Sequence, residues 1–181
     1  MKFADLFQNT EARPFRFALV FAAIIVTVLL TQQARSQETQ VVNWTTSYEE
    51  AIDEAQQTNT PVMLFFGGSD WCPWCKKLQN EVFQSPEFAA WVDGRMVPVL
   101  VDFPKQSSLP PQLANQNNRL LERFRPHLTG FPTALFIRSD GAVIGKMGYE
   151  EGGVRNWIFK AQAIVGKLDK IALNWKTPTF K

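Results

Sequence analysis

The two cysteines of this 181-residue chain, Cys72 and Cys75, are separated by two residues. They follow a short apolar run, 62–66, that predicts a buried strand, and they precede a stretch that predicts a helix. This order places Cys72 at a helix N-terminus, where free backbone N–H groups and the helix dipole favour a thiolate. Cys75 follows almost one turn later, within reach of a disulfide. The pair can therefore cycle between a dithiol and a disulfide with little backbone movement.

Two other uses of the cysteine pair are a structural disulfide and half of a zinc site. A disulfide that closes so small a loop constrains the unfolded chain very little, so it would add little stability. A closed zinc site needs two further Cys or His ligands, and the chain has no other cysteine and a single histidine, His127. We therefore favour a redox-active pair, with a structural bridge and a metal-binding role as the alternatives.

A tryptophan precedes the first cysteine and a lysine follows the second, which gives the pattern Trp-Cys-x-x-Cys-Lys behind an apolar strand. Together with Gly-Phe-Pro-Thr at 130–133, which leads into the apolar run 134–137, this pattern resembles the active site of the thioredoxin superfamily. The resemblance extends from about Asn43 to about Ile171. The tract 77–102 is most similar to exported thioredoxin-like domains, including that of transmembrane disulfide reductases. The resemblance implies an α/β, thioredoxin-like fold: a central mixed sheet flanked by helices on both faces.

The resemblance also implies roles for the site residues. Cys72 is the catalytic nucleophile that forms a mixed disulfide with a client, and Cys75 is the catalytic residue that resolves it. The peptide bond before Pro132 is cis, Pro132 faces the cysteines, and the Phe131 backbone pairs with the client like a strand. An apolar rim around Cys72 docks the client, although simple packing of a tight loop is the alternative for its two tryptophans. The residues predicted to bind the client are Trp71, Pro73, Trp74, Phe131 and Pro132.

One position departs from the thioredoxin pattern. Thioredoxins carry a buried carboxylate six positions before the first cysteine, and here that position is Phe66. The proton of the resolving cysteine would then pass to water, Glu81 or Lys76. Asp70, close to the first cysteine, either caps the following helix, which we favour, or tunes the nucleophilic thiolate by its charge.

The N-terminal segment predicts export. Residues 17–30 form an apolar run of signal-peptide length, short of the ~20 residues that span a bilayer comfortably. Two arginines precede this run, and small residues at 34–36 offer a cleavage site before Gln37. The alternative to cleavage is a membrane anchor over residues 17–31. Both leave the arginines inside and place the cysteines in the periplasm or outside the cell.

We predict three parts of the chain: a signal peptide or anchor at 1–36, a thioredoxin-like domain at 37–173, and a C-terminal tail at 174–181. The first part holds four of the 19 basic and two of the 17 acidic residues, so residues 37–181 have no net charge. A neutral domain does not favour nucleic acid as a partner. The predicted partners are client proteins with disulfides or thiols and a redox partner. The domain is predicted to be a monomer that needs no metal or organic cofactor and touches a membrane only through an uncleaved N-terminal segment.

Beyond the cysteines, the sequence alternates strand and helix patterns. Residues 96–101 predict a strand, and 134–137 and 142–146 predict a hairpin around a Ser-Asp-Gly turn. Residues 157–171 predict a final amphipathic helix. The polar segment 103–118, with its three prolines, predicts a long loop that is either a flap contacting the partner or a tolerated insertion.

A different class of function is a binding module that holds Cu(I) or a client protein without turnover, because two soft thiolates suit Cu(I). The sequence lacks the cluster of methionine and histidine that copper carriers tend to show. It therefore favours an exported thiol–disulfide oxidoreductase that exchanges disulfides with protein clients. The direction of exchange remains open between reduction, oxidation and isomerisation.

Overall fold

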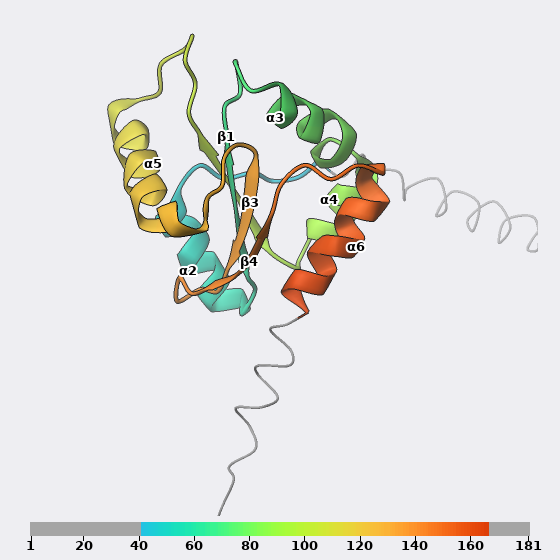
Figure 1. Cartoon of the computed structure of the whole chain (residues 1–181). Coiled ribbons are helices and arrows are strands. Elements are labelled where there is room, and N and C mark those ends of the chain that lie inside the picture. The colour runs from blue at the N-terminus through green and yellow to red at the C-terminus, as the bar shows by residue number, and fades with distance from the viewer. Residues whose placement is uncertain (1–40, 167–181) are drawn as a thin grey trace, which may run out of the picture. The chain divides into compact units, whose positions relative to one another are not determined.

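The computed structural model describes residues 41–166, which are built on a four-stranded sheet (Figure 1). Its strands are β1 (Val62–Gly67), β2 (Val97–Asp102), β3 (Thr133–Ile137) and β4 (Val143–Met147), in the spatial order β2-β1-β3-β4. β1 and β2 are parallel, whereas β3 runs antiparallel to both β1 and β4. The mixed sheet predicted from the sequence is confirmed.

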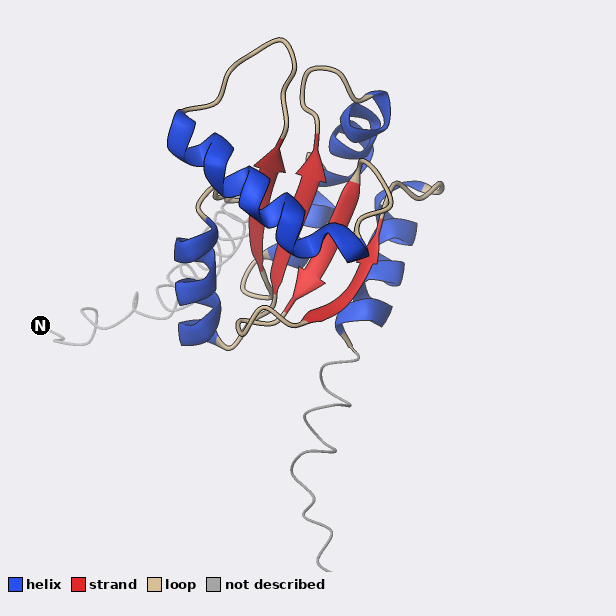
Figure 2. Cartoon of the chain, turned by 60° about the vertical axis from the view of Figure 1, so that its left-hand side comes forward, coloured by secondary structure: helices blue, strands red, loops and turns tan. Residues whose placement is uncertain are grey.

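Helices cover both faces of the sheet, as Figure 2 shows. α3 (Pro73–Leu78), α4 (Pro86–Val92) and α6 (Gly153–Val165) enclose one core, and α2 (Tyr48–Thr58) and α5 (Pro111–Phe124) enclose the other. β1 lies between the two cores and is buried along its whole length, which explains its continuous apolar sequence. The predicted arrangement of helices on both faces is therefore also confirmed.

The polypeptide after the cysteines turns in two short steps. The π-helical turn η1 (Gln79–Phe83) continues α3, and Ser85 then starts α4 by accepting a hydrogen bond from the Phe88 N–H at 3.1 Å. Pro86 follows as the first residue of α4, where proline loses no backbone hydrogen bond. These turns pack the helices against the core that also holds both cysteines.

The loop predicted over 103–118 is wrong in its second half. α5 begins at Pro111, and only residues 103–110 lie outside a helix. Proline suits the first helical position because its missing N–H would have no partner there, so these prolines start a helix. α5 is anchored by Leu120 and Phe124, which are buried. It ends in a 3-10 turn, η2 (Arg125–His127).

The predicted hairpin is confirmed. β3 and β4 are joined by a turn in which the Arg138 N–H donates to the Ala142 carbonyl and the Gly141 N–H donates to the Arg138 carbonyl, both at 2.9 Å. Gly141 has a φ of +83°, which glycine adopts without a steric penalty.

The final helix, α6, begins at Gly153, four residues earlier than predicted. Its predicted end, residues 167–171, lies outside the described residues, as do the predicted segment 1–36 and the tail 174–181. Within residues 41–166, no helix combines the length and the apolar character needed to cross a membrane.

Candidate active site

The two cysteines form a disulfide at the start of α3, with their Cα atoms 5.2 Å apart. Cys72 is the N-cap residue of the helix, and Cys75 lies within its first turn. The backbone N–H of Cys75 donates to the Cys72 Sγ at 3.2 Å. In the dithiol form, this N–H is positioned to stabilise a thiolate on Cys72 and not one on Cys75. The local geometry therefore makes the two sulfur atoms chemically unequal.

Burial does not separate the two cysteines. Cys72 is 3% exposed and Cys75 is 2% exposed, so both belong to the core under α3. The hydrogen bond at the helix start is therefore a feature that distinguishes the two sulfur atoms where residue burial does not.

Trp71 is fixed beside the disulfide by three neighbours. Its indole Nε1–H donates to the Phe103 carbonyl at 2.7 Å, and its ring lies 6.0 Å from that of Phe131. Its indole also covers Gly68 so closely that a Cβ atom there would collide with it. The residue before Cys72 therefore has a single well-defined place.

Trp74 stands on the surface, 53% exposed. Its ring packs 5.2 Å from that of Tyr149, and the Lys77 ammonium lies over both rings. The Tyr149 hydroxyl donates to Glu81 Oε2 at 2.7 Å, which ties this pair to η1. Trp74 and Tyr149 thus form a second aromatic surface at the cysteine motif.

Phe131 and Pro132 are far from the cysteines in the sequence and directly precede β3. The peptide bond between them is cis. The Phe131 ring stacks on Phe103 at 5.4 Å and packs against the core that contains the disulfide. Pro73, the remaining predicted client-binding residue, is the exposed first residue of α3.

Phe66 faces away from the cysteines. It is fully buried in the core under α2 and α5, where the centre of its ring lies 6.4 Å from that of Phe124. Gly67, the next residue of this strand, does lie beside Cys75, since a Cβ atom there would be 3.5 Å from the Cys75 Sγ. Glu81, one predicted proton acceptor, accepts a hydrogen bond from a tyrosine, and Lys76, the other, donates to the Asp70 carbonyl at 2.8 Å.

The prediction that Asp70 caps the helix is wrong, because Cys72 occupies the N-cap position. The Asp70 carboxylate instead accepts hydrogen bonds from the backbone N–H groups of Lys105, Gln106 and Ser107, at 3.0, 2.6 and 3.1 Å. These bonds, the one from Lys105 foremost, lower the pKa of Asp70 from its ordinary 3.8. A lowered pKa means that this attachment is fully present above pH 3.8 and is lost only as the pH falls through the lowered value.

Sequence reasoning gave no individual role to Phe103 and Lys105, although both lie in the segment 103–118 that it offered as a flap or an insertion, and it missed Tyr149. The first two follow β2 directly, and the carboxyl ends of parallel strands meet at one edge of a sheet. Because β1 and β2 are parallel, that rule would have placed Phe103 and Lys105 beside the cysteine loop. No local signal marks Tyr149, which reaches Trp74 only through the path of the chain after β4.

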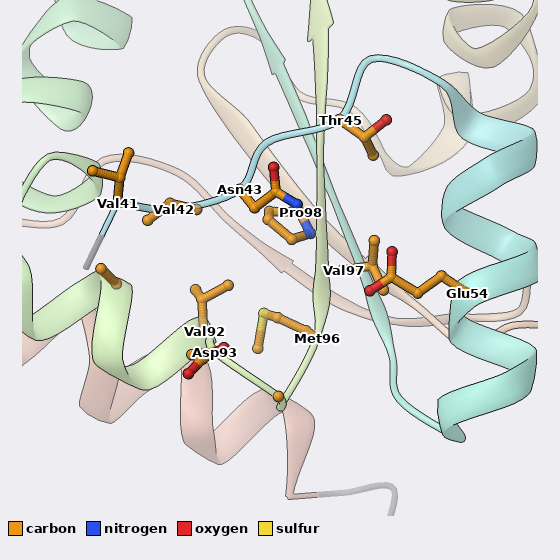
Figure 3. A pocket seen from close by; sticks show the side chains of 12 residues that line it. Val41, Val42, Asn43, Thr45, Glu54, Val92, Asp93, Met96, Val97 and Pro98 are labelled. Carbon is orange, nitrogen blue, oxygen red and sulfur yellow. The ribbon is translucent and has the colours of Figure 1, made fainter. Parts of the chain in front are cut away.

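A cleft of about 270 Å³ lies elsewhere (Figure 3). It is formed where β2 begins, whereas the cysteines follow the end of the parallel strand β1, so it lies at the other end of the sheet. None of the predicted site residues lines it. Its lining residues are Val41, Val42, Asn43, Thr45, Glu54, Ala89, Val92, Asp93, Gly94, Met96, Val97 and Pro98.

Comparison with known proteins settles the family. Residues 48–161 match the family described as a thioredoxin-like domain. The chain belongs to this thioredoxin-like family. The disulfide bond reductase DsbH of Chlamydia pneumoniae is 36% identical over 132 residues, which is 73% of this chain and 78% of that protein. A solved structure of a DsbH oxidoreductase has a TM-score of 0.66 at 35% identity, over 70% of this chain and 85% of that one.

More distant thioredoxin-like relatives agree with this assignment. The thioredoxin-related protein DsbJ of C. pneumoniae is 26% identical over 145 residues, which is 79% of this chain but 41% of that protein. A thioredoxin from Thermus thermophilus, with a TM-score of 0.50 and 21% identity over 68% of this chain and 86% of that one, shares the fold. With a Cys72–Cys75 disulfide in a thioredoxin-like domain, the chain is a protein disulfide oxidoreductase, and the direction of the reaction is open.

Proposed function

We propose that the chain is an exported oxidoreductase that exchanges disulfides with protein clients through Cys72 and Cys75. The observation that carries this proposal is the hydrogen bond from the Cys75 N–H to the Cys72 Sγ, within a pair already close enough to be joined. A single N–H donor favours a thiolate on one sulfur, and the second sulfur stands ready to displace it.

The exchange proceeds in two displacements. The Cys72 thiolate attacks one sulfur of a client disulfide, a bond forms between them, and the other client sulfur leaves as a thiolate that takes up a proton. Cys75 then loses its proton and attacks the Cys72 Sγ. The Cys72–Cys75 disulfide forms, and the first client sulfur leaves. The client gains two electrons, and the enzyme loses two. The reverse sequence oxidises a client dithiol.

The proton of Cys75 passes to water in this proposal. The strand position that carries a carboxylate in thioredoxins is Phe66, which lies in the other core. Glu81 and Lys76 each make a hydrogen bond to another partner, at 2.7 and 2.8 Å. We assign the proton to water because Phe66 has no acceptor atom.

The client lies between surfaces from two segments, the cysteine motif and the residues before β3. The Phe131 backbone beside Pro132 pairs with the client as a strand would, and main-chain pairing of this kind accepts many sequences. Trp71 on one side and Trp74 on the other provide apolar contacts around the cysteine motif. The relative DsbH, which is named a disulfide bond reductase, supports clients that carry disulfides. A redox partner that restores the enzyme after each exchange completes the proposal.

We expect the purified, reduced protein to reduce the disulfides of insulin in the presence of dithiothreitol, at least about tenfold faster than dithiothreitol alone. The double variant Cys72→Ser, Cys75→Ser is the matched control and should give the background rate. A Cu(I) titration in parallel addresses the binding-module alternative. Tight Cu(I) binding combined with background reduction would replace the enzyme proposal with that alternative.

Export gives a separate prediction. A reporter that is active only outside the cytoplasm, fused after Lys181, should be active in a bacterial host, because the apolar run at 17–30 directs the following domain across the membrane. N-terminal sequencing of the product should find Gln37 at or near the start. Recovery of the full-length fusion in washed membranes would favour the anchor over cleavage, and an inactive reporter would exclude export of either kind.

A further inference from the structure

The segment 103–107, which directly follows β2, lies against the loop that carries the cysteines. The Phe103 N–H donates to the Gly67 carbonyl at 2.9 Å, and the carboxylate of Asp102 accepts bonds from the Ser69 N–H and Oγ–H at 2.8 and 2.6 Å. Figure 1 and Figure 2 show the β1–α3 and β2–α5 connections at the same end of the sheet. The two connections are thus joined by direct hydrogen bonds.

We propose that Asp70 is a positioning residue that holds segment 103–107 against Trp71 and so builds a docking wall for protein clients. The docking wall consists of Trp71, Phe103 and Lys105. This inference rests on the proposed function, since it names the surface on which clients of that same site dock.

The docking wall adjoins the nucleophile. Trp71 is the residue before Cys72, and its indole N–H is held by the Phe103 carbonyl at 2.7 Å. The Lys105 ammonium lies 3.9 Å from the centre of the Trp71 ring, within the range of a cation–π contact. The Phe103 ring stacks on Phe131, whose backbone is the proposed strand-pairing site. The wall therefore runs from the cysteine loop to the segment before β3.

Asp70 is the main attachment of the outer part of this wall. Residues 103–107 belong to no helix or strand, so their backbone N–H groups find no partner in regular structure. Three consecutive N–H groups, those of Lys105, Gln106 and Ser107, converge on the Asp70 carboxylate. Loss of that carboxylate would release these groups to water and free Lys105 from its place over Trp71. The core beneath would be unaffected, because all these bonds lie at the surface.

A positioning role differs from the alternative in which Asp70 tunes the thiolate by charge. Positioning affects the binding of a large client and leaves the intrinsic reactivity of Cys72 unchanged. Charge tuning would shift the pH profile of Cys72 alkylation and would affect large and small disulfides alike. The two roles are therefore separated by the size of the substrate and by the pH profile.

The experiment compares Asp70→Ala, Asp70→Asn and the control Asp53→Ala, which removes the same charge from an exposed position on α2. Insulin is the large substrate, and 2-hydroxyethyl disulfide is the small one. For Asp70→Ala we expect KM for insulin to rise about fivefold, or ~1 kcal/mol at 1.4 kcal/mol per tenfold, with kcat unchanged. Asp70→Asn keeps one acceptor oxygen and should show a smaller rise. Asp53→Ala should match the wild type.

Three further readouts decide the proposal. Rates with 2-hydroxyethyl disulfide and the pH profile of Cys72 alkylation should be the same in Asp70→Ala, Asp70→Asn, Asp53→Ala and the wild type. The double variant Trp71→Ala, Asp70→Ala should have a KM for insulin little higher than that of Trp71→Ala alone. Both residues act through the same docking wall, so their effects should not add. A shifted alkylation profile, or an Asp70→Ala protein with the wild-type KM for insulin, overturns the inference. If the wild type itself fails to reduce insulin, the proposed function has failed instead.

Discussion

Replacing Cys72 by serine will abolish disulfide exchange, whereas replacing Cys75 by serine will produce a protein that traps its clients. Cys72 receives the N–H hydrogen bond at the helix start, and a thiolate there attacks first. A serine hydroxyl cannot replace it, so we expect a loss of on the order of 10³-fold or more in kcat/KM. Without Cys75, the mixed disulfide on Cys72 has no internal thiol to resolve it.

The measurements are turnover with insulin and covalent complexes on non-reducing gels after exposure to oxidised client proteins. In the reduced wild type, Cys72 should also be alkylated faster than Cys75 at neutral pH. In the disulfide form the two residues are 3% and 2% exposed, so the hydrogen bond to the Cys72 Sγ is the asymmetry on which this expectation rests. The double serine variant should trap nothing. Trapping by the Cys72 variant and not by the Cys75 variant would reverse the assignment of roles.

The largest expected effect on stability is that of Trp157→Ala. Trp157 is fully buried. The centre of its ring lies 5.5, 5.6 and 6.1 Å from the ring centres of Phe83, Phe88 and Trp91. Its indole N–H also donates to the Gly148 carbonyl at 3.0 Å, which ties α6 to the end of β4. Truncation to alanine leaves a cavity among aromatic rings and should reduce the free energy of unfolding by about 3–5 kcal/mol.

Denaturant unfolding monitored by circular dichroism checks this, with a lower midpoint at an unchanged slope as the expected result. Trp157→Phe keeps a ring in the core but loses the hydrogen bond to Gly148, so it should be clearly less destabilising. Trp74→Ala is the matched surface control, since Trp74 is 53% exposed, and it should change the free energy of unfolding by under about 1 kcal/mol. Equal losses in Trp157→Ala and Trp74→Ala would contradict this account of the core.

Several features of the protein follow from local sequence. The order of apolar strand, Cys-x-x-Cys and helix predicts the helix start at Cys72, because the change from a strand pattern to a helix pattern is visible in neighbouring residues. The Ser-Asp-Gly turn predicts the β3–β4 hairpin for the same reason, since its hydrogen bonds join residues only a few positions apart. The resemblance to thioredoxins then supplies the order of the remaining elements.

Only the tertiary structure decided the partners of Asp70, which lie 35 to 37 positions along the chain. From sequence, an acidic residue before a helix is most simply a cap, because the backbone donors that compete for it lie in another loop. The same holds for the start of α5, since a proline-rich polar segment does not show by itself that a helix begins at Pro111. Both errors arise because contacts between distant segments, whose register depends on how the strands pair, outweigh the local preferences that a sequence pattern records.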